Sequence, residues 1–126
     1  MNTDTGVVLA GDAHLATSLK SRLLGLIGRT SLPPGYALGI GECDWVHTFG
    51  VCLTIDVAYC DKTGRVLRIV DSLAPNRIAP RASGATIAWE IEAGEAGGFR
   101  GRVHEGQRLV LQPAITPEPK TERQKV

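Results

Sequence analysis

The chain has 126 residues, of which 43% are apolar and 5% aromatic, and its 14 basic and 13 acidic side chains leave a net charge of +1. This length suits one domain with one core, and the composition is that of a globular protein. The near-balanced charge is untypical of proteins that grip phosphate backbones or anionic lipid, and no apolar stretch approaches the roughly 20 residues that span a bilayer. We therefore expect neither nucleic acid nor a membrane as a partner.

The N-terminal segment and the cysteines predict a cytoplasmic protein. Asp4 stands where a secretory signal would carry positive charge. The three cysteines are odd in number and form no C-x-x-C pair, which indicates reduced thiols. No cofactor and no metal ion are expected.

The first expected elements are a short strand and a helix. Gly6–Ala10 is a short apolar run typical of a strand. Apolar residues then recur every three or four positions, which places them on one face of a helix: Leu15, Leu19, Leu23, Leu26 and Ile27. Asp12 is positioned to cap the start of this helix, and Gly28 to end it in the left-handed conformation.

The rest of the ordered chain is expected to form strands. The ranges with a β pattern are Tyr36–Ile40, Trp45–Val51, Ile55–Cys60, Arg65–Val70, Thr86–Glu92 and Arg108–Leu111. The turn Asp61–Gly64 is typical of a hairpin in which Gly64 takes a positive φ. Residues 113–126 carry three prolines and mixed charges, as disordered tails do. The prediction is one β-rich domain, residues 5–112, built as a sandwich or barrel with one N-terminal helix packed against it.

Several stretches carry a family resemblance. Ser21–Arg29 reads as R-x-x-G-L-x-G-R, and Val46–Phe49 with Ile55–Val57 as H-T-F … I-D-V. Trp89–Gly94, which reads W-E-I-E-A-G, is similar to L-E-L-x-A-G. In this order they resemble the motifs of domain of unknown function family 192, from about Ala16 to position 111. The resemblance implies a jelly-roll-like β fold with one helix packed against it. It implies no activity, because that family is uncharacterised.

The chain departs from the family pattern at three places. Val51-Cys52 stands where the family often has Met near the end of its H-T-F strand. Asn76 stands where it often has Trp after a proline, and Gln107 replaces the Asp of its last turn. Any site that depends on those side chains is not expected here.

Asp56 is the candidate site residue with the strongest signal. It stands between Ile55 and Val57 in a predicted strand, so its carboxylate is expected to leave water at least in part and to need partners. Two interpretations stay open. Asp56 is either a ligand-binding or acid/base group, or it accepts backbone N–H bonds where the chain bends after residues 52–54.

His47 and Thr48 lie on opposite faces of their predicted strand. If Trp45 and Phe49 share the core side with His47, the imidazole needs a partner there, and Asp56 is the expected one. Such a pair either positions a general base near neutral pH or is a satisfied structural contact.

Glu90 points away from the three apolar residues of Ile87–Ile91. It is solvated if that apolar face is the one that packs on the core. If both faces of the sheet are covered, Glu90 joins His47 and Asp56 in a polar cluster. One histidine and two carboxylates can hold a metal ion, but their spacing in the sequence does not bring them together, so no metal site is predicted.

Arg22 and Arg29 lie two turns apart in the predicted helix, on roughly one face. Their guanidinium groups either clamp an anion or stay solvated, with Arg29 favoured by the negative end of the helix dipole.

Three functional hypotheses follow. The favoured one is a non-enzymatic β-module that binds a small polar ligand or a protein, because no nucleophile–base–orienter set is recognisable. Its candidate ligand-binding residues are His47, Thr48, Asp56, Glu90, Arg29 and Arg22. The second is a hydrolase- or isomerase-type enzyme with His47 as base and Asp56 or Glu90 beside it in a pocket. The third is an accessory protein that docks through a sheet edge or the helix face and exposes an apolar patch.

Overall fold

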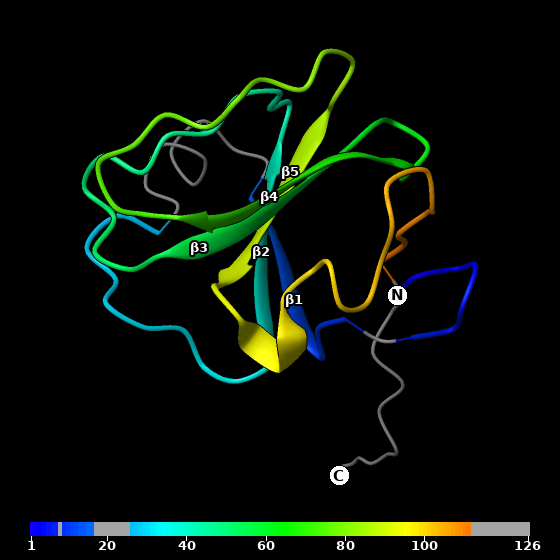
Figure 1. Cartoon of the computed structure of the whole chain (residues 1–126), viewed down its shortest axis with the longest axis horizontal. Coiled ribbons are helices and arrows are strands. Elements are labelled where there is room, and N and C mark those ends of the chain that lie inside the picture. Colours follow the sequence, from blue (N-terminus) through cyan, green and yellow to red (C-terminus); the bar gives the residue numbers. More distant parts are fainter. Residues whose placement is uncertain (8, 17–25, 112–126) are drawn as a thin grey trace, which may run out of the picture.

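Five strands form one open, twisted sheet in the computed structural model of the chain, which describes residues 1–7, 9–16 and 26–111 (Figure 1). The elements are β1 (Asp12–Ala16), β2 (Tyr36–Gly41), β3 (Ile55–Cys60), β4 (Val66–Leu73), β5 (Ile87–Glu92) and a short 3-10 turn, η1 (Glu95–Gly97). Their order across the sheet is β1-β2-β5-β3-β4. β1 lies parallel to β2, and every other neighbouring pair is antiparallel.

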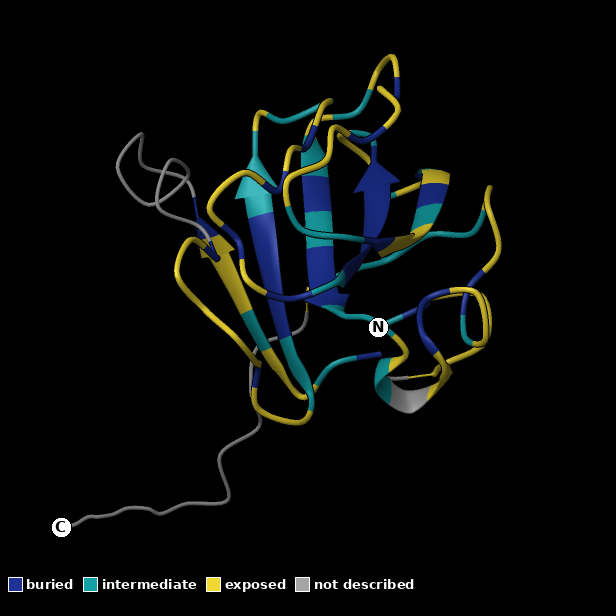
Figure 2. Cartoon of the chain, turned by 60° about the vertical axis from the view of Figure 1, so that its left-hand side comes forward, coloured by how far each residue is buried: buried dark blue, intermediate teal, exposed yellow. Residues whose placement is uncertain are grey.

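β3 is buried along its whole length. All six of its residues are buried, and its Val, Ile and Tyr side chains are those that favour a strand with both faces covered. β4 and β5 pair with it on either side. Figure 2 shows the burial concentrated on these inner strands and exposure on the connections.

Loops, rather than a second sheet, cover both faces within the described residues. On one face, which we call face A, strand residues pack against Leu26, Leu32, Val46, Val51 and Leu53 of the loops. On the other, face B, they pack against Leu9, Phe99 and Val103. The mainly β class is therefore confirmed, while the jelly-roll sandwich or barrel is not, because each face buries its apolar side chains under irregular chain.

The predicted helix does not begin where the pattern placed it. Asp12–Ala16 is β1, paired residue by residue with Tyr36–Ile40, so Asp12 caps no helix and Leu15 lies in a strand. Pairing with β2 satisfies the backbone groups of β1, and this tertiary contact outweighs the helical spacing of the leucines. Residues 17–25 and the predicted tail, 113–126, lie outside the described residues. No helix among the described residues is long and apolar enough to cross a membrane.

Four of the predicted strands are confirmed as β2, β3, β4 and β5, with ends shifted by at most three residues. Three others are wrong. Gly6–Ala10 forms no strand in its described part, and Trp45–Val51 and Arg108–Leu111 contribute single bridges instead of ladders. Their backbone groups bond to other loops, as the N–H of Thr48 does to the carbonyl of Arg77 at 2.9 Å.

The segment that follows β5 wraps the outer edge of β4 and the N-terminus. The N–H of Gly106 donates to the carbonyl of Val66, and the N–H of Val66 donates to that of Gln107, both at 2.8 Å. The N–H of Thr3 donates to the carbonyl of Arg108 at 2.8 Å, and Figure 1 shows the blue N-terminal segment beside the orange one. The edge of β4 is thereby paired instead of left open.

Gly64 lets the segment around Leu109 pack closely against the turn after β3. Its replacement is therefore expected to destabilise the folded chain. Its φ is 89°, and a Cβ atom there would lie 2.2 Å from the carbonyl oxygen of Leu109. We expect Gly64→Ala to lower the free energy of unfolding by about 3 kcal/mol, through both strain and overlap. Gly106→Ala is the matched control, because Gly106 has φ 94° and open space around its Cβ position, so about 1 kcal/mol is expected. If urea unfolding shows the same loss of unfolding free energy for Gly64→Ala and Gly106→Ala, the close approach of Leu109 to Gly64 is contradicted.

Candidate functional site

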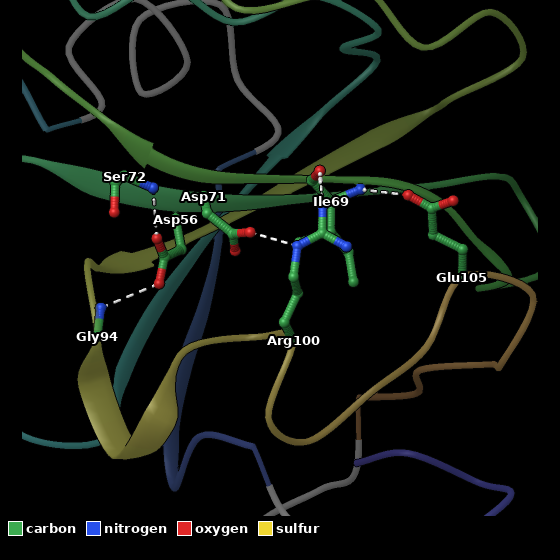
Figure 3. Close-up of polar contacts among 7 residues, drawn as sticks. All are labelled: Asp56, Ile69, Asp71, Ser72, Gly94, Arg100 and Glu105. Carbon is green, nitrogen blue, oxygen red and sulfur yellow. Dashed lines mark hydrogen bonds and ion pairs between the residues drawn. The ribbon is translucent and has the colours of Figure 1, made fainter.

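Backbone groups satisfy the carboxylate of Asp56, which is 3% exposed. Its Oδ1 accepts the N–H of Ser72 at 2.8 Å, and its Oδ2 accepts the N–H of Gly94 at 3.0 Å (Figure 3). Ser72, with φ 54°, belongs to a bulge where two residues of β4 lie opposite Asp56. Gly94 begins the turn after β5. The carboxylate therefore fastens two irregular points of the backbone to β3.

The chain closes tightly over Asp56. A Cβ atom at Gly98 would lie 2.8 Å from Oδ2, so the backbone after η1 packs directly on the carboxylate. Beside it, the guanidinium of Arg102 donates to the carbonyls of Gly98 at 3.1 Å and Glu95 at 3.0 Å. Asp56 is thus buried, and it accepts backbone N–H bonds, as one of the two interpretations expected. Those N–H groups come from β4 and the turn after β5, however, and not from the bend after residues 52–54.

The same loop covers the edge of β4 with charged side chains. Arg100 donates to the carbonyl of Ile69 at 3.0 Å and also bonds Asp71. The N–H of Ile69 donates to Glu105 at 3.2 Å (Figure 3). These contacts occupy both outward backbone groups of Ile69, which removes a template for strand addition at this edge.

His47 does not reach Asp56, so the predicted pair is wrong. His47 is exposed, its Nδ1 accepts the N–H of Phe49 at 3.3 Å, and its ring lies 5.4 Å from that of Phe49. The inward positions of this segment belong to Val46, 5% exposed, and Thr48, 0% exposed. Since alternate residues point to opposite sides, the imidazole faces water.

The buried side chain of Thr48 joins its own loop to the loop between β4 and β5. Its Oγ1 donates to the carbonyl of Ala74 at 2.6 Å and accepts the N–H of Arg77 at 2.9 Å. This confirms that Thr48 and His47 point to opposite sides. It also makes Thr48 a structural residue, because both hydrogen-bonding capacities of the hydroxyl are used within the fold.

Glu90 and Asp56 lie on opposite faces of the sheet. Glu90 is directly opposite Leu38 of β2 and Val57 of β3, whose side chains belong to face A. Asp56 is opposite Ile91, which packs on face B. Both faces are covered, yet the polar cluster predicted for that case does not form, because His47, Asp56 and Glu90 point in three different directions.

Burial raises the pKa of Glu90 to about 8. The residue is 6% exposed, and within the described chain its carboxyl group has no hydrogen-bond or ion-pair partner. A carboxyl group in apolar surroundings stays protonated well above its usual range, because ionisation there loses hydration without a compensating charge. On the same face, the hydroxyl of Tyr59 accepts the N–H of Val46 at 3.1 Å, and burial raises its pKa to about 12.

The chemistry available to these residues is limited. A general base must lie within hydrogen-bond reach of the substrate proton that it accepts. The buried Asp56 and Glu90 both lie apart from the exposed His47. Among the described residues, no three side chains of the metal-ligating kinds gather in one place. In the part of the chain that the structure describes, His47 does not form with Asp56 or Glu90 the pair that the enzyme hypothesis places in a pocket.

Arg29 is exposed, and Arg22 lies outside the described residues. The guanidinium of Arg29 lies 5.0 Å from the centre of the Tyr36 ring, on which the ring of His14 also stacks at 5.0 Å. His14 is held in turn by Asp12, with Nε2 and Oδ1 2.7 Å apart. This polar and aromatic group at the β1–β2 end was not predicted, because Asp12 and Arg29 were assigned to a helix and Tyr36 to a separate strand.

Among the seven large apolar side chains that the described residues expose, Val7, Leu15 and Leu111 lie on other segments, and the remaining four lie on three adjoining loops that form one patch. We call it the outward patch, and it consists of Ile27 (49% exposed), Trp45 (44%), Phe49 (49%) and Ile78 (55%) together with the ring of His47. Trp45, His47 and Phe49 were expected to share one side, and they do, but that side faces solvent.

Backbone bridges bring the three loops that carry the outward patch together. His47 bridges Ile78, and Ile27 bridges Val51. The Ile27 side chain lies 3.4 Å from the Cβ position of Gly50, next to Phe49. Gathered exposed apolar side chains mark interaction surfaces more often than scattered single residues do.

Comparison with known proteins places the fold but no activity. A family model described as DUF192, Uncharacterized ACR, matches residues 1–111. A protein of unknown function from Novosphingobium aromaticivorans aligns with a TM-score of 0.65 and 20% identity over 76% of this chain and 71% of its own. A proposed transcription regulator from Sinorhizobium meliloti aligns with a TM-score of 0.66 and 20% identity over 76% and 78%. No curated protein matches the chain.

Proposed function

Because the chain belongs to the DUF192 family, which is described as uncharacterized, we propose a function from the surface of this molecule itself: it is a protein-binding module that docks its partner on the outward patch. The observation that carries the proposal is the gathering of four large apolar side chains, each 44–55% exposed, on three adjoining loops. Water covers these side chains in the free protein, and a partner that buries them gains the hydrophobic free energy of that area.

The composition of the outward patch suits a protein contact. Aromatic residues are enriched at the centres of interfaces, and Trp45 is of the residue type that most often dominates binding energy. The loops that carry the patch are anchored from below, since Thr48 bonds Ala74 and Arg77 and Val46 bonds Tyr59. A rigid support lowers the conformational entropy that binding would otherwise cost.

The buried polar residues fit this reading as parts of the scaffold. Asp56 ties β4 and the turn after β5 to β3. Thr48 holds the underside of the loop whose upper side is the outward patch. The small-polar-ligand version of the binding hypothesis has less support, because its predicted residues Asp56 and Thr48 already have their hydrogen bonds within the fold.

Photo-cross-linking in living cells tests this function. A photoreactive phenylalanine analogue in place of Phe49 is expected to give one discrete adduct, and mass spectrometry should map the contact to a defined segment of one partner protein. The analogue in place of Thr63, an exposed turn residue outside the patch, is the control and should give no such adduct.

Disruption of the patch should remove the same adduct. Ile78→Ser in the Phe49 analogue background is expected to reduce the yield at least tenfold, because it deletes an exposed apolar contact without touching the core. Identical adducts from positions 49 and 63, or an adduct that persists undiminished in the Ile78→Ser chain, would overturn the assignment.

A further inference from the structure

The charges around the outward patch are uneven. The loops that carry it contain three arginines, Arg29, Arg77 and Arg81, and two acidic residues, Glu42 and Asp44. Arg81 lies 3.7 Å from Asp44 and 6.0 Å from the centre of the Trp45 ring, so its charge is already matched. Arg29 and Arg77 are exposed, and within the described chain neither has an ion-pair partner.

The two arginines without an ion-pair partner join the patch at different points of the backbone. Arg77 directly precedes Ile78, which bridges His47. Arg29 follows Ile27 by two residues, and Ile27 lies against Gly50. His47 and Gly50 are three residues apart, so at most about 10 Å of chain separates these two backbone positions. Because the guanidinium of Arg29 extends to the ring of Tyr36, 5.0 Å from its centre, a partner segment that meets both arginines must reach from Ile78 to Tyr36.

The acidic residues on and beside these loops already have partners: Asp44 lies against Arg81, and Glu42 is engaged as well. The carboxylate of Glu92 accepts the N–H of Leu32 at 2.8 Å, and that of Glu95 accepts the N–H of Gly35 at 3.1 Å. These two bonds hold down the loop that leads from Arg29 to β2. Arg29 and Arg77 are therefore the charged groups on these loops left without an ion-pair partner in the described chain, and charge complementarity calls for a negative partner.

We infer that the partner presents an acidic segment with an apolar anchor, the anchor seating on Phe49, Trp45 and Ile78 and its carboxylates pairing with Arg29 and Arg77. This inference rests on the proposed function and specifies the chemistry of the partner. Guanidinium groups pair with carboxylates through two parallel hydrogen bonds, which adds orientation to the apolar contact.

Nucleic acid is the competing class of partner, since arginines and aromatic rings also bind single strands. Two observations favour protein. Half of the large apolar side chains in the patch are isoleucines, Ile27 and Ile78, whose branched aliphatic groups offer no flat surface for a base. The chain as a whole carries a net charge of only +1, where a backbone-tracking groove gathers many cations.

A random peptide library displayed against the full chain tests the inference. We expect the wild-type chain to enrich peptides with at least two carboxylates within a few residues of an aromatic or large aliphatic side chain. A synthetic copy of the most enriched peptide should bind the Arg29→Gln/Arg77→Gln chain about tenfold more weakly, and 0.5 M NaCl should remove most of that difference by screening.

Other outcomes separate failure of the inference from failure of the function. Enriched peptides that depend on Trp45 and Phe49 but show no excess of acidic residues would overturn the inference and leave the docking function standing. If the wild-type chain enriches the same peptides as a Trp45→Ser/Phe49→Ser chain, both the inference and the docking function are overturned. Tighter binding of a 20-nucleotide deoxythymidine strand than of the enriched peptide would overturn the inference in favour of nucleic acid.

Discussion

Replacing Glu90 with glutamine is expected to raise the free energy of unfolding at pH 9 by about 3 to 5 kcal/mol and to leave it almost unchanged at pH 5. The pKa of the Glu90 carboxyl group is raised from 4.5 to about 8 by burial in the folded chain. Each unit of difference between the folded and unfolded states corresponds to about 1.4 kcal/mol.

The sign follows from proton binding. Between pH 4.5 and pH 8 the unfolded chain has lost the proton of Glu90 while the folded chain still holds it. The folded state therefore binds more protons, and its stability falls as the pH rises through this window. Glutamine has nearly the same shape and cannot ionise, so the Glu90→Gln chain lacks this fall.

Urea unfolding at pH 5, 7 and 9, followed by tryptophan fluorescence, measures the effect. Glu92→Gln is the matched control, because it lies two residues further along the same face and leaves Glu90 in place. The Glu92→Gln chain should keep the wild-type decline with pH. A wild-type chain as stable at pH 9 as at pH 5 would contradict the buried, unpaired carboxyl group.

Asp56→Asn is expected to lower the free energy of unfolding by about 3 kcal/mol. The asparagine amide would turn a donor toward one of two backbone donors, the N–H of Ser72 or that of Gly94, which lie 2.8 and 3.0 Å from the carboxylate oxygens. A buried N–H left without an acceptor, together with the loss of a charged acceptor, costs on this order.

Asp71→Asn is the control for Asp56→Asn. Asp71 lies on the neighbouring strand, and its side chain is 43% exposed and paired with Arg100. Exposed pairs of this kind contribute at most about 1 kcal/mol. Thermal unfolding of both variants should therefore show a clearly larger loss for Asp56→Asn. Similar losses would mean that Asp56 does not hold the bulge of β4.

Local pattern was enough to predict most of the sheet. Ile55–Cys60 and the turn that ends at Gly64 carry strong β and turn signals, and both formed as expected. The leucine spacing that begins at Leu15 misled, because periodicity reports a possible helix and not the strand pairing that β2 offers to Asp12–Ala16. Pairing partners far along the chain carry no local signal.

The candidate site was harder to predict for a physical reason. The alternation of side chains along an extended segment shows that Trp45, His47 and Phe49 share a side, yet it does not show which side is exposed to solvent. Large aromatic rings were expected to face the core, so Trp45, His47 and Phe49 were assigned to the buried side. The smaller Val46 and Thr48 occupy that side instead. The expected exclusion of nucleic acid and the cytoplasmic location stay predictions.

The tryptophans offer the most direct measurement of the central claim, that the row of Trp45, His47 and Phe49 faces solvent and is free to bind. The chain has two tryptophans, so Trp89→Phe leaves Trp45 as the sole emitter and Trp45→Phe leaves Trp89. Because Trp45 is 44% exposed and Trp89 is less exposed, we expect acrylamide to quench Trp45 clearly more efficiently than Trp89. Quenching of Trp45 as weak as that of Trp89 would place the row inside the fold and contradict the account.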